Sequence, residues 1–232
     1  MNSDTKWFIY ENEDPQISFV ELVDRMGDRL SIVNAARVSY AKESREFGDK
    51  DNKLLQYLIS NGHMSPFEHV VFTFRFKVPI FTARQHMRYR TWSLNEQSGR
   101  FLKETEETVA FYNPTYFRSQ STEDKQRSND DQINPAIYSA VLEGTCPASQ
   151  ALEAHNTYCF TFYEQLIQAG IAREQARMVL PLAEYTEYIG TIDLRNLYHF
   201  IEERNTPHAQ WEIRQIAAAL KNYLVSQDLW FW

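Results

Sequence analysis

The sequence has few of the residues on which several large classes of protein depend. Only 7 glycines occur in 232 residues, and none completes a G-x-G-x-x-G or G-x-x-x-x-G-K-[ST] pattern, so we expect neither a Rossmann nor a P-loop nucleotide site. The two cysteines, Cys146 and Cys159, are too few for a disulfide framework and suit a reducing compartment. No run of about 18 apolar residues is present, and the chain does not start like a signal peptide. We therefore expect a cytoplasmic protein without a membrane segment.

Basic residues are also in deficit. The chain has 24 Lys and Arg against 31 Asp and Glu, a formal net charge of −7, so we expect no broad basic surface for nucleic acid or acidic membranes. Hydrophobic residues make up 43% of the chain and aromatic residues 14%, which excludes an intrinsically disordered protein. At roughly 150 residues per domain, the length favours one domain spanning residues 1–232.

The apolar pattern predicts helices around a modest number of strands. Between Val70 and Val78, apolar residues alternate with polar ones, as in a strand with one buried face. We expect a further strand over 19–23 and helices over 28–38, 51–61, 79–88, 149–169, 172–179 and 193–204, with a last helix opening at 206–207. No strand-helix-strand unit repeats, so the expected fold class is α+β, a mostly antiparallel sheet flanked by long helices. Residues near 119–148 are expected to form an exposed loop.

One segment reverses the overall charge. Residues 74–103 hold seven basic side chains and one acid, Glu96, a net charge of +6 against −13 for the rest of the chain. Arg84 and Arg88 lie four residues apart on one expected helix face, with Gln85 beside them. Guanidinium groups arranged in this way suit a phosphate or another small anion. A solvated charged surface would account for such a run more simply, and it remains open.

This segment carries a resemblance to a known family. Arg88-Tyr89-Arg90, followed by seven residues and Ser98, is similar to the signature of the flavin-dependent thymidylate synthases. Further blocks resemble that family in its order, and they read HMSPFEH at 63–69, EQARMVLP at 174–181 and HAQWE at 208–212. The likeness runs from about Phe19 to Leu220. Tyr89 departs from it, because the family usually has histidine there, and Asp193 stands where asparagine is expected.

The resemblance implies an activity and its cofactors. The family methylates dUMP reductively to dTMP, with methylenetetrahydrofolate as the carbon donor and with FAD, recharged by NADPH, as the source of hydride. Its members form homotetramers that share active sites between chains. The resemblance places the catalytic role of activating the uracil on Arg204, and no metal is expected. It implies dUMP contacts from Gln85, Arg88, Glu96, Gln97, Ser98, Gly99, Arg100, Arg177 and Arg204. It implies FAD contacts from Ser65, Arg88, Tyr89, Arg90, Glu96, Asp193, Arg195 and His199.

Two of these arginines could equally have purely structural roles. Arg204 is suited to stabilise a helix C-terminus, and Arg177 to form a surface ion pair. Neither cysteine lies in a matching block, so a thiolate adduct is not expected. Two other functions compete with the enzyme: a nucleotide-binding or flavin-binding relative disabled at Tyr89, and a single-strand nucleic-acid-binding protein that stacks bases on Trp92 and Phe101.

Overall fold

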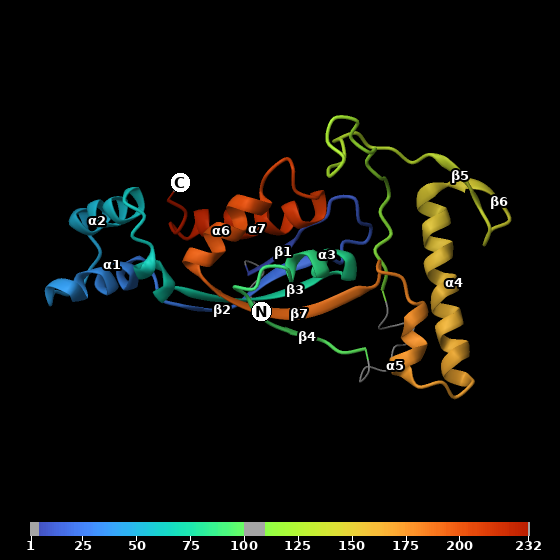
Figure 1. Cartoon of the computed structure of the whole chain (residues 1–232), viewed down its shortest axis with the longest axis horizontal. Helices are drawn as coiled ribbons and strands as arrows, with labels where there is room; N and C mark the ends of the chain where they lie inside the picture. Colours follow the sequence, from blue (N-terminus) through green and yellow to red (C-terminus); the bar gives the residue numbers. More distant parts are fainter. Residues whose placement is uncertain (1–4, 100–109, 232) are drawn as a thin grey trace.

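A five-stranded antiparallel sheet lies at the centre of the computed structural model, which describes residues 5–99 and 110–231 (Figure 1). Its strands follow the order β1-β2-β3-β7-β4. Their bounds are β1 Lys6–Phe8, β2 Phe19–Met26, β3 Val71–Pro79, β4 Ser93–Glu96 and β7 Tyr185–Asp193. The strand expected over 19–23 is thus confirmed and extends three residues further.

Strand β3 is the middle of the sheet, and its alternating sequence explains why. Phe72, Phe74 and Phe76 are fully buried on one face, whereas Arg75 and Lys77 lie on the other face. Along its whole length β3 pairs with β7, from Val71 opposite Asp193 to Pro79 opposite Tyr185. The expected period of two is therefore confirmed, and it gives the sheet one dry face and one polar face.

Helices α3 (Ile80–His86), α6 (Leu194–Arg204) and α7 (Trp211–Ser226) lie on the dry face of the sheet (Figure 1). Asp193 caps α6, because its carboxylate accepts a hydrogen bond from the backbone N–H of Asn196 at 3.0 Å. The expectation that the last helix opens at 206–207 is wrong. Residues 206–209 form a turn closed by a hydrogen bond from the Ala209 N–H to the Thr206 carbonyl, and the helix starts two residues later.

The two ends of the molecule carry the remaining elements (Figure 1). One end holds α1 (Arg29–Arg37) and α2 (Asp49–Ser60), joined by an ion pair of 2.7 Å between Arg37 and Asp51. The other end holds the long helix α4 (Ala148–Gln168) and the short α5 (Arg173–Ala176). The loop expected near 119–148 differs in its second half, where β5 (Ala136–Ser139) and β6 (Gly144–Pro147) pair as a hairpin.

Short 3-10 helices complete the described chain: η2 Val38–Tyr40, η3 Ser65–His69 and η4 Arg177–Val179. The described elements do not follow the repeated strand-helix-strand order that builds a parallel sheet, and every strand pair in the described ranges is antiparallel. The predicted α+β class is therefore confirmed. Among the helices that the structure describes, none is both long and apolar enough to cross a membrane.

Candidate active site

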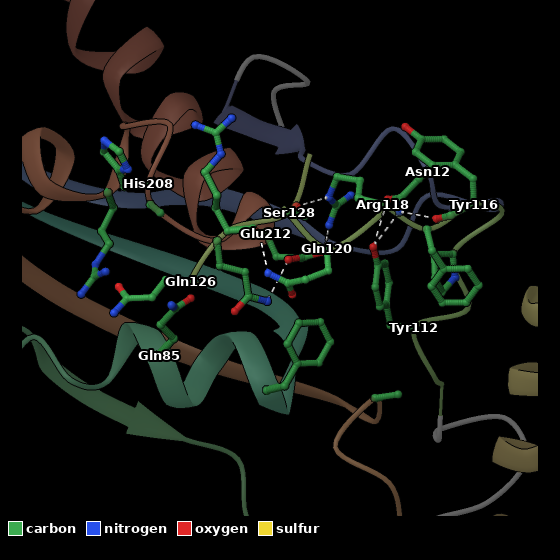
Figure 2. A pocket seen from close by; sticks show the side chains of 18 of the residues that line it. Asn12, Gln85, Tyr112, Tyr116, Arg118, Gln120, Gln126, Ser128, His208 and Glu212 are labelled. Atoms are coloured by element: carbon green, nitrogen blue, oxygen red, sulfur yellow. Dashed lines mark hydrogen bonds and ion pairs between the residues drawn. The ribbon is translucent and has the colours of Figure 1, made fainter. Parts of the chain in front are cut away.

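The first candidate site is a pocket of about 600 Å³ above the dry face of the sheet, which we call the Arg204 pocket (Figure 2). Gln85 reaches it from α3, and Arg204 reaches it as the last residue of α6. The irregular segment 112–128 and residues 208–212, before and at the start of α7, form the other walls. Gln85 and Arg204 were both expected to contact dUMP, and the fold brings them to one cavity although they are far apart in the sequence.

Three buried polar atoms in this pocket have no hydrogen-bond partner among the described residues: Gln85 Oε1, Arg204 Nε and Arg118 Nη1. An unpaired buried donor or acceptor is costly, because it has lost its water and gained nothing in exchange. The residues that carry these atoms line the pocket, so its wall includes an amide and two guanidinium groups, which can accept from and donate to a polar ligand. Gln85 and Arg204 are therefore candidate contacts for a polar molecule.

Arg118 and Glu212 form the polar wall of the pocket, and sequence reasoning missed both. Arg118 donates to the Glu212 carboxylate through Nη2 and to Ser128 Oγ through Nε at 3.2 Å. Its guanidinium carbon lies 4.3 Å from the centroid of the Trp211 ring, so the charge is also held by an aromatic face. The signal for Glu212 was present, because it ends the matching block 208–212, whereas Arg118 lies in a segment without a recognisable pattern.

A second pocket of about 730 Å³, which we call the Arg177 pocket, lies beside the polar face of the sheet. Arg177 lines it from η4 as an exposed side chain. Glu96 lines it from β4 and accepts a hydrogen bond of 2.7 Å from Thr186 Oγ1. Gln97 and Gly99 also lie in its wall. The Arg177 pocket therefore contains four more of the residues expected to contact dUMP: Glu96, Gln97, Gly99 and Arg177.

Helix α3 lines the two pockets with different faces. Phe81 and Gln85, four residues apart, line the Arg204 pocket, whereas Ile80 and Arg84 line the Arg177 pocket. The expected dUMP residues that line cavities are thus divided between two pockets within one chain. Arg88 lines neither pocket, and it is exposed just after α3. Arg100 lies outside the described residues, and Ser98 lies between two residues of the Arg177 pocket.

The residues expected to bind FAD follow the exposed side of α6 and the segments next to it. Ser65 starts η3, which packs against α6. Arg195 and His199 are exposed on α6, and Arg195 forms an ion pair of 2.5 Å with Glu68 of η3. Arg90 is exposed after α3. Glu96, by contrast, lies in the Arg177 pocket, so one chain does not bring the whole expected set together.

Asp193 and Tyr89, two further residues expected to bind FAD, also make hydrogen bonds within the chain. The Asp193 carboxylate holds the first turn of α6, where it also accepts a hydrogen bond of 2.5 Å from the Asn196 side chain. The Tyr89 side chain points inward and is 8% exposed. Burial and the hydrogen bond to Glu203 raise the pKa of Tyr89 to about 12. Tyr89 is therefore a protonated donor at every working pH.

Other residues considered from the sequence have simpler structural roles. His86 is fully buried, with its Nδ1 2.7 Å from the Tyr188 hydroxyl oxygen. Within the described ranges, no group of three His, Cys, Asp or Glu side chains could hold a metal ion, and the expectation of no metal stays a prediction. Trp92 is 6% exposed and packs against Phe76, so it cannot stack bases as the nucleic-acid alternative requires.

Neither cysteine lines either pocket. Cys146 lies in β6, and Cys159 lies on α4 with its sulfur 3.5 Å from His155 Nε2. Burial raises the pKa of the Cys159 thiol, which disfavours the reactive thiolate. The absence of both from the pockets agrees with the expectation that no thiolate adduct forms.

Comparison with known proteins decides the family. Residues 21–227 match the family model described as thymidylate synthase complementing protein. The chain belongs to this family. The flavin-dependent thymidylate synthase of Thermosipho africanus is 40% identical over 215 residues, which cover 91% of this chain and 88% of the relative. The corresponding enzyme of Thermus thermophilus is 46% identical over 202 residues, 87% of this chain and 69% of the relative.

A solved structure supports the same assignment. The UMP/dUMP methylase PolB of Streptomyces cacaoi, bound with 5-Br dUMP, has a TM-score of 0.71 and 32% identity, covering 91% of each chain. The resemblance stated from the sequence is therefore confirmed, and so is the expected fold class. Tyr89 remains the departure from the thymidylate synthase signature that concerns the site directly.

Proposed function

We propose that this member of the thymidylate synthase complementing protein family converts dUMP to dTMP by reductive methylation, with methylenetetrahydrofolate as the carbon donor, FAD as the cofactor and NADPH as the reductant. Its flavin-dependent relatives and the methylase PolB support the enzyme over both alternatives. The observation that carries the assignment is the meeting of Gln85 and Arg204 in the wall of the Arg204 pocket. The free cysteines and the absence of a spanning helix among the described residues are consistent with the cytoplasm as the proposed location.

The chemistry of uracil fits this pair. The imide edge of uracil presents an N3–H donor between two carbonyl acceptors, so Gln85 Oε1 accepts from N3–H and Arg204 donates to a neighbouring carbonyl oxygen. When carbon 5 becomes nucleophilic, negative charge develops over N3 and the carbonyls. A guanidinium fixed in a pocket stabilises that charge without reorganising, and it stays protonated at every working pH.

The phosphate of dUMP needs a separate cationic site, and Arg177 supplies it in this proposal. Arg177 is exposed and lines a pocket with Gln97 and Gly99, and none of the ion pairs among the described residues involves it. Its guanidinium is thus available for a bidentate contact with phosphate oxygens. Ser98 and Arg100 are proposed to complete this contact, as the family resemblance implies.

The residues present fit a flavin dinucleotide. Arg88, Arg90 and Arg195 are exposed cations, and Ser65 is an exposed hydroxyl, a donor set that suits a diphosphate. FAD supplies the hydride chemistry of the reaction when it is bound. The chain's own contribution is to hold the dinucleotide at these side chains, with His199 beside them on α6, and to hold dUMP at the pockets.

Because the substrate residues fall into two pockets, we propose that each active site is built between chains of a homotetramer. One chain gives Gln85 and Arg204, and another gives Glu96 to Arg100 and Arg177. The polar face of the sheet carries exposed side chains, among them Arg75 and Ile189. Exposed apolar side chains also gather at the α4 end, where they support contact with another copy: Tyr138, Val141, Leu142, Tyr158 and Phe162.

The direct test is a complete reaction with the purified protein. With dUMP, methylenetetrahydrofolate, FAD and NADPH, we expect dTMP to form, measured by mass spectrometry, and the purified protein to show flavin absorbance. Omission of FAD from flavin-stripped protein should abolish the product. A folded protein that takes up no FAD and makes no dTMP would refute the proposal.

A further inference from the structure

Tyr89 lies between α3 and the end of α6, in direct contact with the two residues that close α6. Its hydroxyl donates a hydrogen bond of 2.7 Å to Glu203 Oε2. Its ring meets the Phe200 ring edge to face, with centroids 4.9 Å apart. The side chain is thus fixed at its tip by a carboxylate and along its edge by an aromatic neighbour.

Arg204 rests on the same ring. The guanidinium carbon lies 4.9 Å from the Tyr89 centroid, within the range of a cation–π interaction. None of the ion pairs among the described residues includes Arg204. Arg204 contacts Tyr89 through the ring face and through a side-chain hydrogen bond, and the charge of Arg204 and this bond oppose the larger rise in the Tyr89 pKa caused by burial and Glu203.

This arrangement suits an arginine that must act on a substrate. A carboxylate bound to the guanidinium would neutralise its charge and occupy its N–H donors. An aromatic ring attracts the cation through the flat face of the guanidinium. The N–H donors at the edge of the guanidinium then remain available. Glu203 instead accepts from the Tyr89 hydroxyl, and that hydrogen bond, with the charges of His199 and Arg204, lowers the pKa of Glu203.

We propose that Tyr89 is a positioning residue for Arg204: its ring holds the guanidinium in the pocket, and Glu203 fixes that ring through the phenol hydroxyl. The inference rests on the role proposed above for Arg204. In this proposal Tyr89, which departs from the family signature, contacts Arg204 of the same chain, and the exposed Arg88 and Arg90 contact the flavin.

Three variants separate the parts of this arrangement. Tyr89→Leu removes the ring and should lower kcat for dTMP formation roughly tenfold, with a smaller change in KM for dUMP, because the contact acts on a charge-stabilising group. Tyr89→Phe keeps the ring and should retain more activity than Tyr89→Leu. Glu203→Ala changes an exposed side chain, so it should fold normally and lower kcat by a few fold.

A matched control and a second readout keep the test specific. Tyr198 is a buried tyrosine of α6 whose ring packs on Trp230 and does not touch Arg204. Tyr198→Leu should therefore lower stability without the selective loss of kcat. Crystal structures of the wild type and Tyr89→Leu should show the Arg204 guanidinium displaced in the variant. NADPH-dependent flavin reduction should stay unchanged in all of them.

The outcomes distinguish this inference from the proposed function. If the wild type makes no dTMP, the proposed function fails. If the wild type is active, but folded Tyr89→Leu and Glu203→Ala keep its kcat and Arg204 stays in place in the crystal, the positioning role is wrong. If Tyr89→Leu does not fold, an unchanged kcat in Glu203→Ala is enough to overturn it.

Discussion

At the scale of single residues, the site depends on a few charges that the fold holds without neutralising them. Arg204 is the clearest case, since its position at the end of α6 puts a positive charge at the helix C-terminus and also places the side chain in the pocket wall. Sequence alone could not decide between these two roles. The place of Arg204 in the pocket wall favours the functional role, and the structural role remains compatible with it.

Loss of Arg204 should affect turnover far more than substrate affinity. Arg204→Ala should lower kcat on the order of 10²-fold, the scale seen when one preorganised donor to a developing anion is removed. Arg204→Lys should rescue little, because a point charge on a flexible stem does not reproduce the planar fork. Separate assays of dTMP formation and NADPH oxidation would show the difference, with Arg25→Ala as the control, because Arg25 is an exposed arginine of β2 that lines neither the Arg204 pocket nor the Arg177 pocket. A change in dUMP affinity alone would contradict this role.

His86 should make the protein sensitive to acid. Burial lowers the pKa of His86 to about 3 in the folded state, below the ordinary value of about 6.5 that applies to the unfolded chain. Protons therefore bind the unfolded state preferentially between these values, and His86 contributes stability above pH 6.5 that is lost as the pH falls. The loss should be roughly 1.4 kcal/mol per pH unit.

The comparison of wild type with His86→Gln isolates this contribution from that of the carboxylates. Urea unfolding at pH 7 and pH 5.5 should show a steeper loss of stability for the wild type than for the variant. Parallel profiles for the two proteins would show that His86 is not the group responsible.

At the scale of elements, β7 is the strand that brings the parts of the site together, and the sequence did not predict it. It pairs with β3 on one side and with β4 on the other. Gly190 allows this arrangement, because a Cβ there would lie 2.9 Å from Trp92 Cε3. Only glycine lets the Trp92 ring lie against the strand.

Gly190→Ala should therefore destabilise the protein by about 1–3 kcal/mol, the usual cost of forcing extra volume into a packed core. Gly144→Ala is the matched control, because its Cβ would meet no atom closer than 3.8 Å. Urea unfolding of both variants tests the argument. Equal stabilities of the two variants would mean that the Trp92 ring moves aside freely.

How well the elements could be predicted depended on where the signal lay. Strand β3 and helices α1, α4 and α6 carry their own periodicity or caps, so they were found with small errors at their ends. Strands β4 and β7 and the β5–β6 hairpin were missed, because β4 and the hairpin strands have four residues each and β7 mixes threonine and glutamate with its apolar residues. Their structure is set by pairing with partners distant in sequence.

The site was predictable to the extent that it follows family blocks. Gln85 and Arg204 were named from the sequence, and the structure places them in one pocket. The division of the other residues into a second pocket is a property of the folded chain that no local pattern contains. Arg118 was missed for a related reason, since its partners Trp211 and Glu212 lie more than ninety residues away.

At the scale of the whole molecule, the residues proposed to bind the substrate are divided between two pockets of one chain. The Arg204 pocket offers contacts to a uracil edge, and the Arg177 pocket offers a contact to a phosphate. The two lie on different faces of α3. We propose that the pockets of two copies face each other in a closed symmetric oligomer and together form a working site.

Complementation between two inactive variants tests this account most directly. Arg204→Ala and Arg177→Ala chains, each with its own tag, would be produced together, and assemblies that contain both would be purified through the two tags in sequence. If every site takes Arg204 from one chain and Arg177 from another, about a quarter of the sites in randomly mixed assemblies are intact. We expect these assemblies to recover about a quarter of the wild-type rate of dTMP formation, whereas each variant alone remains inactive. Mixed assemblies that bind FAD and stay as inactive as the single variants would contradict it.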